Sequence, residues 1–380
     1  LQQACVNCHA EELRAANDSH PRSKFTDPRN ADRLLKIDAR ECIACHREHQ
    51  LEQTGPMGVT LPTDFCFHCH QDIAEERPSH AGMAFDTCAA SGCHNYHDNR
   101  ALYESFLVAH AQQPVLNALG RVLARTPDAT KVFAVPVPDA PAAKQTAEVL
   151  ADWHASAHAA ADVNCQDCHR AAQASDAHWI ETPDMAVCES CHAPQVQGFV
   201  QGKHGMRQDP RLSTSLSPMT PAEGRLDFQS DAAHTALTCL SCHGAHRFDT
   251  RAAAVQGCLS CHADEHSLAY LESPHARAWQ AEQRGEADPG SGVSCATCHM
   301  PRELQSVNGH ERVVVNHNQS ANLRPNEKMI RSVCQDCHGL PFVIDALADP
   351  TLIQRNFTGQ PARHIPSVDM AVQREGMNPE

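Results

Sequence analysis

All 20 cysteines of this 380-residue chain lie in ten copies of one motif, in which two cysteines are followed at once by a histidine. Nine copies read Cys-x-x-Cys-His, and the tenth has four residues between its cysteines. Two thiols and an adjacent imidazole are the groups that attach a haem through thioethers and bind its iron. A single Cys-x-x-Cys pair would fit zinc or a redox dithiol equally well. Ten pairs, each followed by histidine, leave that alternative negligible.

The motifs supply the attaching cysteines and the histidine expected as the proximal iron ligand. The nine regular motifs are Cys5/Cys8/His9, Cys42/Cys45/His46, Cys66/Cys69/His70, Cys165/Cys168/His169, Cys188/Cys191/His192, Cys239/Cys242/His243, Cys258/Cys261/His262, Cys295/Cys298/His299 and Cys334/Cys337/His338. In the tenth, Cys88/Cys93/His94, a motif without cofactor would leave two orphan thiols outside the cytoplasm, so we expect attachment there too. The sequence therefore predicts ten covalent haems of the c type.

One motif for every 38 residues is too dense for an ordinary polypeptide core. Aromatic residues make up only 4% of the chain, so few large apolar side chains are available to offset the entropy of ordering it. Flat, apolar porphyrins would take over that role. We therefore expect a mainly α fold with extensive loops, little β-sheet and a core formed by stacked haems. The apoprotein should be largely unfolded.

The formal net charge is −15, and haem propionates would add to it. This balance gives no support to nucleic-acid binding and suits cationic partners, metal ions or mineral surfaces. No apolar run approaches 18 residues, so no transmembrane segment is expected. Haem c is attached outside the cytoplasm and no signal peptide is visible. We therefore expect a processed chain beginning at or near Leu1, in the periplasm or at the cell surface.

The spacing of the motifs predicts a modular chain. Four motifs precede a stretch of 70 residues without any, and six follow it. Within that stretch, three prolines between Val132 and Pro141 favour extended or polyproline backbone. The predicted modules are a tetrahaem module at 1–112, a linker at 113–148, a hexahaem module at 149–340 and a haem-free tail at 341–380.

Histidines outnumber the motifs. Of 27 in the chain, ten belong to motifs, which leaves 17 for at most ten distal positions. This surplus predicts two imidazole ligands at most or all irons. We predict as distal ligands His20, His49, His80, His97, His158, His204, His234, His246, His275 and His317. Further candidates are His266, four residues after a motif histidine, and more loosely His68, His110, His178 and His310, whereas His364 is most simply a surface residue.

Two imidazoles saturate an iron, so such a site exchanges electrons but binds no substrate, and without a methionine ligand its potential is usually low. With histidine in surplus, Met57, Met83, Met185, Met206 and Met300 are better explained by packing than by ligation. The expected activity is therefore electron transfer, not catalysis.

Parts of the chain resemble known multihaem cytochromes. The segment Cys42-Ile-Ala-Cys45-His46-Arg-Glu-His49 and its compact spacing resemble the tetrahaem class III cytochromes c. Gly202-Lys-His204-Gly, Val293-Ser-Cys295-Ala-Thr-Cys298-His299-Met-Pro301 and Asn316-His317-Asn318 are similar to the octahaem hydroxylamine oxidoreductase and pentahaem nitrite reductase group. That second resemblance implies that His204 and His317 are distal ligands.

The catalytic residues of that group are not matched. Its nitrite reductases attach the active-site haem through a motif that ends in lysine, and no motif here does. Its hydroxylamine oxidoreductases cross-link a tyrosine to the catalytic haem. Tyr96, Tyr103 and Tyr270 lie in no pattern that matches.

Three functions fit these observations. The first is an electron conduit to redox partner proteins or extracellular acceptors. As part of it we consider a homopolymeric filament, because Cys5 lies near a terminus and the apolar tail would either dock on a neighbour or pack on its own subunit. The second is a multihaem oxidoreductase acting on a small nitrogen or sulfur oxyanion, which requires a five-coordinate haem. The third is a decahaem subunit inside an outer-membrane porin.

Overall fold

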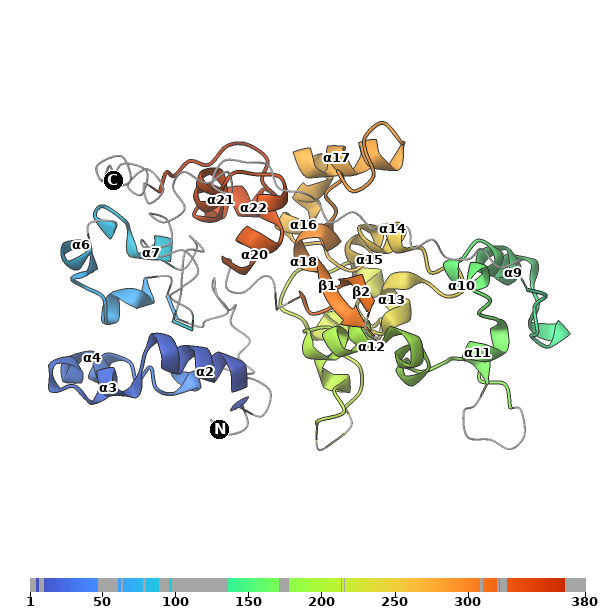
Figure 1. The fold of residues 1–380 in the computed structure, drawn as a ribbon, viewed down its shortest axis with the longest axis horizontal. Coiled ribbons are helices and arrows are strands. Elements are labelled where there is room, and N and C mark those ends of the chain that lie inside the picture. The colour runs from blue at the N-terminus through green and yellow to red at the C-terminus, as the bar shows by residue number, and fades with distance from the viewer. Residues whose placement is uncertain are drawn as a thin grey trace. The chain divides into compact units, whose positions relative to one another are not determined.

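The computed structural model describes residues 5–6, 10–46, 61–62, 64–77, 80–88, 96–97, 136–170, 178–212, 214, 216–307, 310–319, 321 and 327–365. Short helices and long connections make up most of this part of the chain, and its only sheet has two strands (Figure 1). The prediction of a mainly α fold with little β-sheet is confirmed. Within the described residues, no helix is long and apolar enough to cross a membrane.

Contacts between Cα atoms divide the chain into two compact units. The first comprises Leu1–Val122, Glu272–Pro274 and Ala321–Glu380, and the second comprises Leu123–Leu271 and His275–Ser320. The last motif, Cys334/Cys337/His338, therefore belongs with the first four, giving five motifs in each unit. The predicted module at 149–340 grouped this motif with the preceding five, because spacing along the chain carries no information about long-range packing.

The first unit is built from single-turn and short helices. They are α2 (Ala10–Ser19), α3 (Arg22–Thr26), η1 (Pro28–Asn30), α4 (Ala31–Lys36), α5 (Cys42–Cys45), η3 (Phe65–His68), α6 (Ile73–Glu76), α7 (Phe85–Cys88), α20 (Glu327–Ser332), η11 (Cys334–Asp336), α21 (Leu340–Leu347) and α22 (Pro350–Gln354). Most of them stop after one turn where a motif, a proline or an extended residue interrupts the helix.

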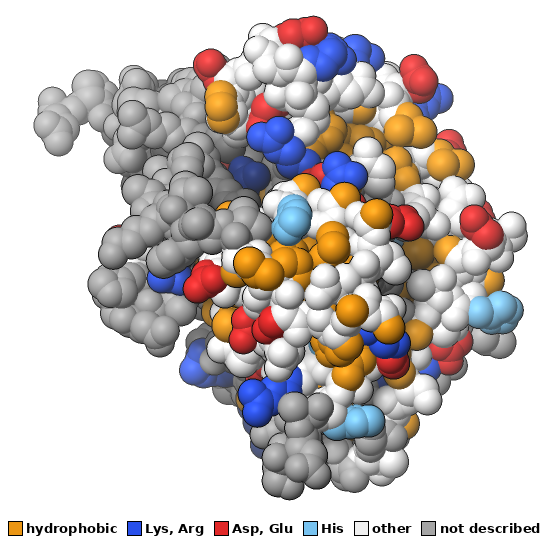
Figure 2. Space-filling model, turned by 90° about the vertical axis from the view of Figure 1, so that its right-hand side faces the viewer, with side chains coloured by type: hydrophobic (Ala, Val, Ile, Leu, Met, Phe, Trp, Pro, Cys, Tyr) orange, Lys and Arg blue, Asp and Glu red, His pale blue; other side chains and the backbone are white. Residues whose placement is uncertain are grey.

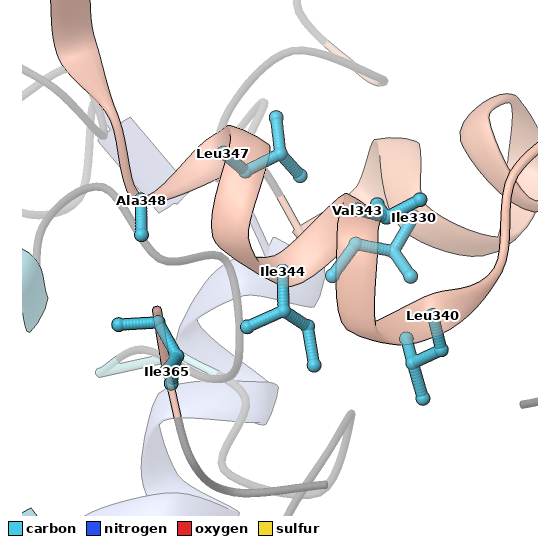
Figure 3. Packing of buried hydrophobic residues seen from close by; sticks show 7 residues of the cluster. All are labelled: Ile330, Leu340, Val343, Ile344, Leu347, Ala348 and Ile365. Atoms are coloured by element: carbon cyan, nitrogen blue, oxygen red, sulfur yellow. The ribbon is translucent and has the colours of Figure 1, made fainter. Parts of the chain in front are cut away.

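The apolar core of the first unit lies around α21. Leu340, Val343, Ile344 and Leu347 recur at helical spacing on one face of this helix, and all four are buried. Figure 3 shows them beside Ile330, Ala348 and Ile365, with which they form one cluster. Met83 and Cys334 pack against the same cluster, which explains why the last motif joins the N-terminal segments.

This core also changes how the tail can act. Ile344, Leu347 and Leu352, which we considered as docking residues for a neighbouring subunit, are buried within their own chain. Asp349 caps α22 by accepting hydrogen bonds from the Thr351 and Leu352 amides. Polymerisation through other surfaces stays a prediction.

The second unit contains most of the remaining elements, with η10 and α17 crossing its boundary. They are η6 (Ala142–Lys144), α9 (Ala147–His154), α10 (Ala157–Ala160), α11 (Cys165–His169), α12 (Met185–Gln201), η7 (Met206–Gln208), η8 (Pro221–Glu223), η9 (Ser230–Ala232), α13 (Cys239–His243), α14 (Thr250–Ala253), α15 (Gln256–Leu259), α16 (Glu265–Ala269), η10 (Tyr270–Glu272), α17 (Pro274–Gln283), α18 (Cys295–His299), β1 (Arg302–Val307) and β2 (His310–Val315). The two strands pair antiparallel, with Arg302 opposite Val315. Helix α12 bends at His192, whose backbone is not helical, just before Pro194.

The Ile344 side chain tests the core of the first unit, since it is 1% exposed. We expect Ile344→Ala to lower the free energy of unfolding by about 2–5 kcal/mol, because it leaves a cavity in the packed cluster. A urea titration of the holoprotein measures this effect. Leu35→Ala is the matched control, because Leu35 is 87% exposed. Equal unfolding midpoints for the two variants would contradict the assignment of the core.

Candidate haem-binding sites

The local structure of the motifs explains their spacing. Cys165–His169, Cys239–His243 and Cys295–His299 each form a single helical turn. In a helix, positions i, i+3 and i+4 lie on one face, so both thiols and the imidazole of such a motif point the same way. Each cysteine thiol occupies the place that a thioether sulfur takes in the haem-bound protein.

Reciprocal caps fix the start of these three turns. In the motif at Cys295, the Ser294 hydroxyl accepts a hydrogen bond from the Thr297 amide, and Thr297 Oγ1 accepts one from the Ser294 amide. The same capping box joins Asn164 to Asp167 and Thr238 to Ser241. The residue before the first cysteine and the residue before the second therefore hold the attachment turn in place.

The structure brings motif histidines together with histidines from outside the motifs. Among the described residues, seven such pairs have ring centres 5.9–6.2 Å apart. The pairs are His70 with His20, His46 with His97, His192 with His158, His169 with His246, His262 with His204, His243 with His317, and His299 with His266.

This separation fits one iron between each pair. A metal–imidazole bond is about 2.0 Å and the ligating nitrogen lies about 1.1 Å from the ring centre, so two imidazoles on opposite sides of one metal have centres about 6.2 Å apart. Stacked rings lie closer, as the His20 and Tyr96 rings do at 4.1 Å. The donor set of two cysteines and two histidines therefore suits haem c at these places.

Burial favours the neutral form of eight of these imidazoles, which is the form that ligates a metal. Burial, together with smaller contributions from the neighbouring His262 and Lys203, lowers the pKa of His204 to about 4. Burial likewise lowers the pKa of His299 to about 4, with His266 the next cause. The pKa values of His20, His70, His158, His243, His246 and His317 are also lowered, in each case mainly by burial.

Backbone carbonyls orient several of the rings. His169 Nδ1 lies 2.6 Å from the Ile180 carbonyl oxygen, and the Trp179 ring stacks on His169 at 4.5 Å. His317 Nδ1 lies 2.9 Å from the Val315 carbonyl oxygen. Gly198 of α12 is needed beside His317, because a Cβ there would come 2.9 Å from the His317 amide nitrogen. These contacts fix which ring nitrogen faces the paired histidine.

Attachment cysteines of consecutive motifs lie in contact. In four pairs, the first cysteine of one motif is within hydrogen-bonding reach of the first cysteine of the next: Cys5 with Cys42, Cys66 with Cys88, Cys188 with Cys239 and Cys258 with Cys295. Along the chain, these four contacts alternate with contacts between consecutive motifs that involve the second cysteine of a motif.

At three other junctions a second cysteine takes part. Cys45 interacts with Cys69, Cys168 with Cys188, and Cys242 with Cys258. At the last of these, a Cβ on Gly257 would lie 3.0 Å from the Cys242 carbonyl oxygen, so glycine permits the close approach. The sites of the first four motifs and those of the fifth to ninth therefore follow one another in sequence order within their units.

Cys191 has an unusual position among the attachment cysteines. It is exposed, whereas most of the described cysteines are half-buried. It lies in α12 directly before His192, where the backbone leaves helical geometry, so this motif does not form the regular turn of the three capped motifs. The Ser190 hydroxyl donates a hydrogen bond to the Val187 carbonyl oxygen at 2.8 Å, and its oxygen lies 3.8 Å from the Cys191 sulfur. Attachment of haem at Cys191 stays a prediction, and the polypeptide would leave that edge of the macrocycle open to solvent.

Cys242 is the other exposed cysteine among those described, and its thiol has a different setting. Burial raises the pKa of this thiol, and the neighbouring Cys258 and Cys261 raise it further. This setting places the Cys242 thiol next to the attachment cysteines of the following motif.

The predicted distal histidines have different positions. His20, His97, His158, His204, His246 and His317 each face a motif histidine. His80 is half-buried near His70, and His275 is half-buried in α17. His234 is exposed after η9, contrary to the position expected of a ligand. His364 is exposed as expected and forms an ion pair with Asp345.

One paired histidine was not among the ten we predicted. His266 faces His299 at 6.1 Å, although we named it only as a further candidate. The available signal was Asp264, a helix-capping residue type that begins a new helix two residues after the motif histidine His262. Several predicted residues lie outside the described part of the chain: Cys8, His9, His49, Cys93, His94 and His110.

A family model described as a doubled CXXCH motif matches residues 36–75. This segment contains the second and third motifs, at Cys42 and Cys66. The match indicates covalently bound haem c and a multihaem c-type cytochrome, a class of electron carriers found typically outside the cytoplasm. No curated protein and no solved structure matches the chain.

The lowered pKa values predict acid sensitivity. An unfolded histidine takes up a proton below pH about 6.5, whereas His204 and His299 stay neutral in the folded chain down to about 4. Their contribution to folding is therefore complete above pH about 6.5 and is lost as the pH falls toward about 4. Urea-unfolding midpoints of the holoprotein across this window should fall on acidification. His178→Gln, at an exposed histidine, should leave this dependence unchanged, and a midpoint that rises would contradict the prediction.

Proposed function

We propose that this chain is an electron conduit in which ten haems c, mostly held between two histidines, form a sequence of closely spaced redox sites. The observation that carries the proposal is the contact between attachment cysteines of consecutive motifs, as between Cys258 and Cys295. Since each cysteine anchors the edge of one macrocycle, touching anchors place neighbouring macrocycles within short range of one another. When haem is bound, its iron supplies the electron-transfer chemistry.

The protein residues hold the sites in one state. The cysteines would fix each macrocycle to its motif, and the paired histidines would supply two imidazole ligands to each iron, which would leave no open position for a small molecule. The contact of His169 with the Ile180 carbonyl oxygen keeps its ring from rotating. Sites held this way change little between oxidation states, which favours rapid electron exchange over catalysis.

The paired histidines favour a conduit over an oxyanion oxidoreductase. A catalytic site of that kind needs an iron with one histidine and a free position. In the part of the chain that the structure describes, seven motif histidines face a second imidazole. These pairs support the conduit over the oxidoreductase alternative, which ligand-sensitive high-spin spectra would favour.

Charge bears on the partners. On the face drawn in Figure 2, acidic and basic side chains are interspersed, and apolar side chains form small clusters between them. The net charge of −15 is therefore not gathered into one acidic area on that face. We propose a periplasmic or cell-surface location, with redox proteins or extracellular acceptors as partners, and no role for nucleic acid.

The number of haems tests the cofactor assignment. The intact holoprotein should have the mass of the chain plus ten haems, one for each motif. Substituting both cysteines of the irregular motif, Cys88→Ala with Cys93→Ala, should remove one haem. Mass spectrometry under denaturing conditions measures both values. Nine haems in the unmodified protein, with no loss in the variant, would show that the irregular motif is empty.

Removal of one distal histidine tests the ligation. His204→Ala should convert one low-spin haem to a high-spin form, because His262 would lose its imidazole partner across the iron. Electron paramagnetic resonance and magnetic circular dichroism of the oxidised holoprotein detect the change. His234→Ala is the control, since His234 is exposed. An unchanged low-spin count in His204→Ala would overturn the assignment of His204.

A further inference from the structure

The ring of His262 has a different neighbour from the other oriented rings. His20, His169 and His317 each place Nδ1 within 2.6–2.9 Å of a backbone carbonyl oxygen. His262 Nδ1 instead faces a carboxylate, Asp264 Oδ2, at 3.5 Å. Both side chains are largely covered, with 24% of His262 and 17% of Asp264 exposed.

Asp264 is held in this position by the helix that it begins. Its Oδ1 accepts a hydrogen bond from the Ser267 amide at 3.1 Å, and its Oδ2 accepts one from the Ser267 hydroxyl at 2.8 Å. Phe228 also packs against the His262 ring, with ring centres 5.2 Å apart. The carboxylate is therefore a fixed neighbour of the imidazole and not a mobile surface charge.

We propose that Asp264 is a positioning residue that lowers the reduction potential of the haem attached at Cys258 and Cys261. The inference rests on the proposed function, in which His262 and His204 ligate that iron. A carboxylate beside Nδ1 makes the imidazole a stronger electron donor, and its negative charge favours ferric over ferrous iron. Asp264 acts on a one-electron couple whose two histidine ligands stay in place.

The same residue makes two neighbouring sites unequal. Helix α16, which Asp264 caps, carries His266, and His266 faces His299 of the next motif. The first cysteines of these two motifs, Cys258 and Cys295, are in contact. Asp264 therefore lies where two adjacent sites meet, and its charge is directed at the proximal ligand of one of them. Of these two haems, the one attached at Cys295 would therefore have the higher reduction potential and be reduced first.

The experiment compares full-length holoproteins. Asp264→Asn keeps an oxygen acceptor for Ser267 but removes the charge. In an anaerobic redox titration followed by absorbance and electron paramagnetic resonance, one low-potential component should move upward. The expected size is about a tenfold change in its oxidised-to-reduced ratio at fixed potential, which is about 59 mV for a one-electron couple. The other components should keep their potentials.

Two variants separate charge from structure. Ser267→Ala removes the hydroxyl partner in α16 but leaves the carboxylate beside His262, so the potentials should be unchanged. Asp249→Asn makes the same substitution at the N-cap of α14 and should also leave them unchanged. An unshifted titration in Asp264→Asn, or an equal shift in Ser267→Ala, would overturn the role of Asp264. If the unmodified holoprotein showed no bis-histidine signals, the proposed function would be overturned, and this inference with it.

Discussion

A single helical turn that presents two sulfurs and an imidazole on the same side is the element on which this structure depends. Each capped turn needs only a capping residue before the first cysteine and a polar partner before the second, as Ser294 and Thr297 show. The facing imidazole arrives from another segment, so every paired site ties two stretches of chain together. These anchors take over part of the role of an apolar core. The main apolar cluster of the first unit is accordingly small and is confined to residues around α21.

How far the sequence predicts such a protein follows from which interactions are local. The helical class was predictable, because dense attachment motifs and few large apolar side chains favour short helices over sheet. The attachment residues stay a prediction, which rests on the spacing of cysteine and histidine within one turn. The exposure of Cys191 was not predictable, since it follows from the bend of α12 at His192 and not from the motif. The position of the last motif was not predictable either, because it depends on Met83 and Cys334 meeting at a cluster formed by α20 and α21. No periodicity in the sequence encodes that contact.

The distal histidines lie between these extremes. His97 and His246 were predicted from their closeness to a motif, and each faces a histidine of another motif. His266 has the same kind of position, but its direction depends on the turn that Asp264 starts. His234 shows the opposite case, because a histidine between two motifs crosses a haem face only if the chain passes there, and this one is exposed. Residue counting gives the supply of ligands, whereas the local backbone decides which of them are used.

The division into units has a consequence for how the protein is made. The second unit is inserted in sequence between Leu1–Val122 and Ala321–Glu380 of the first, which is therefore a discontinuous domain. Contacts between consecutive motifs join segments that are close in sequence, so their entropic cost is low and the second unit is expected to fold independently of the segments on either side of it. The N-terminal segments of the first unit cannot complete their apolar core until α20 and α21 are available to pack against them. We therefore expect the second unit to fold before the first, and the N-terminal residues, although synthesised first, to be among the last that become buried.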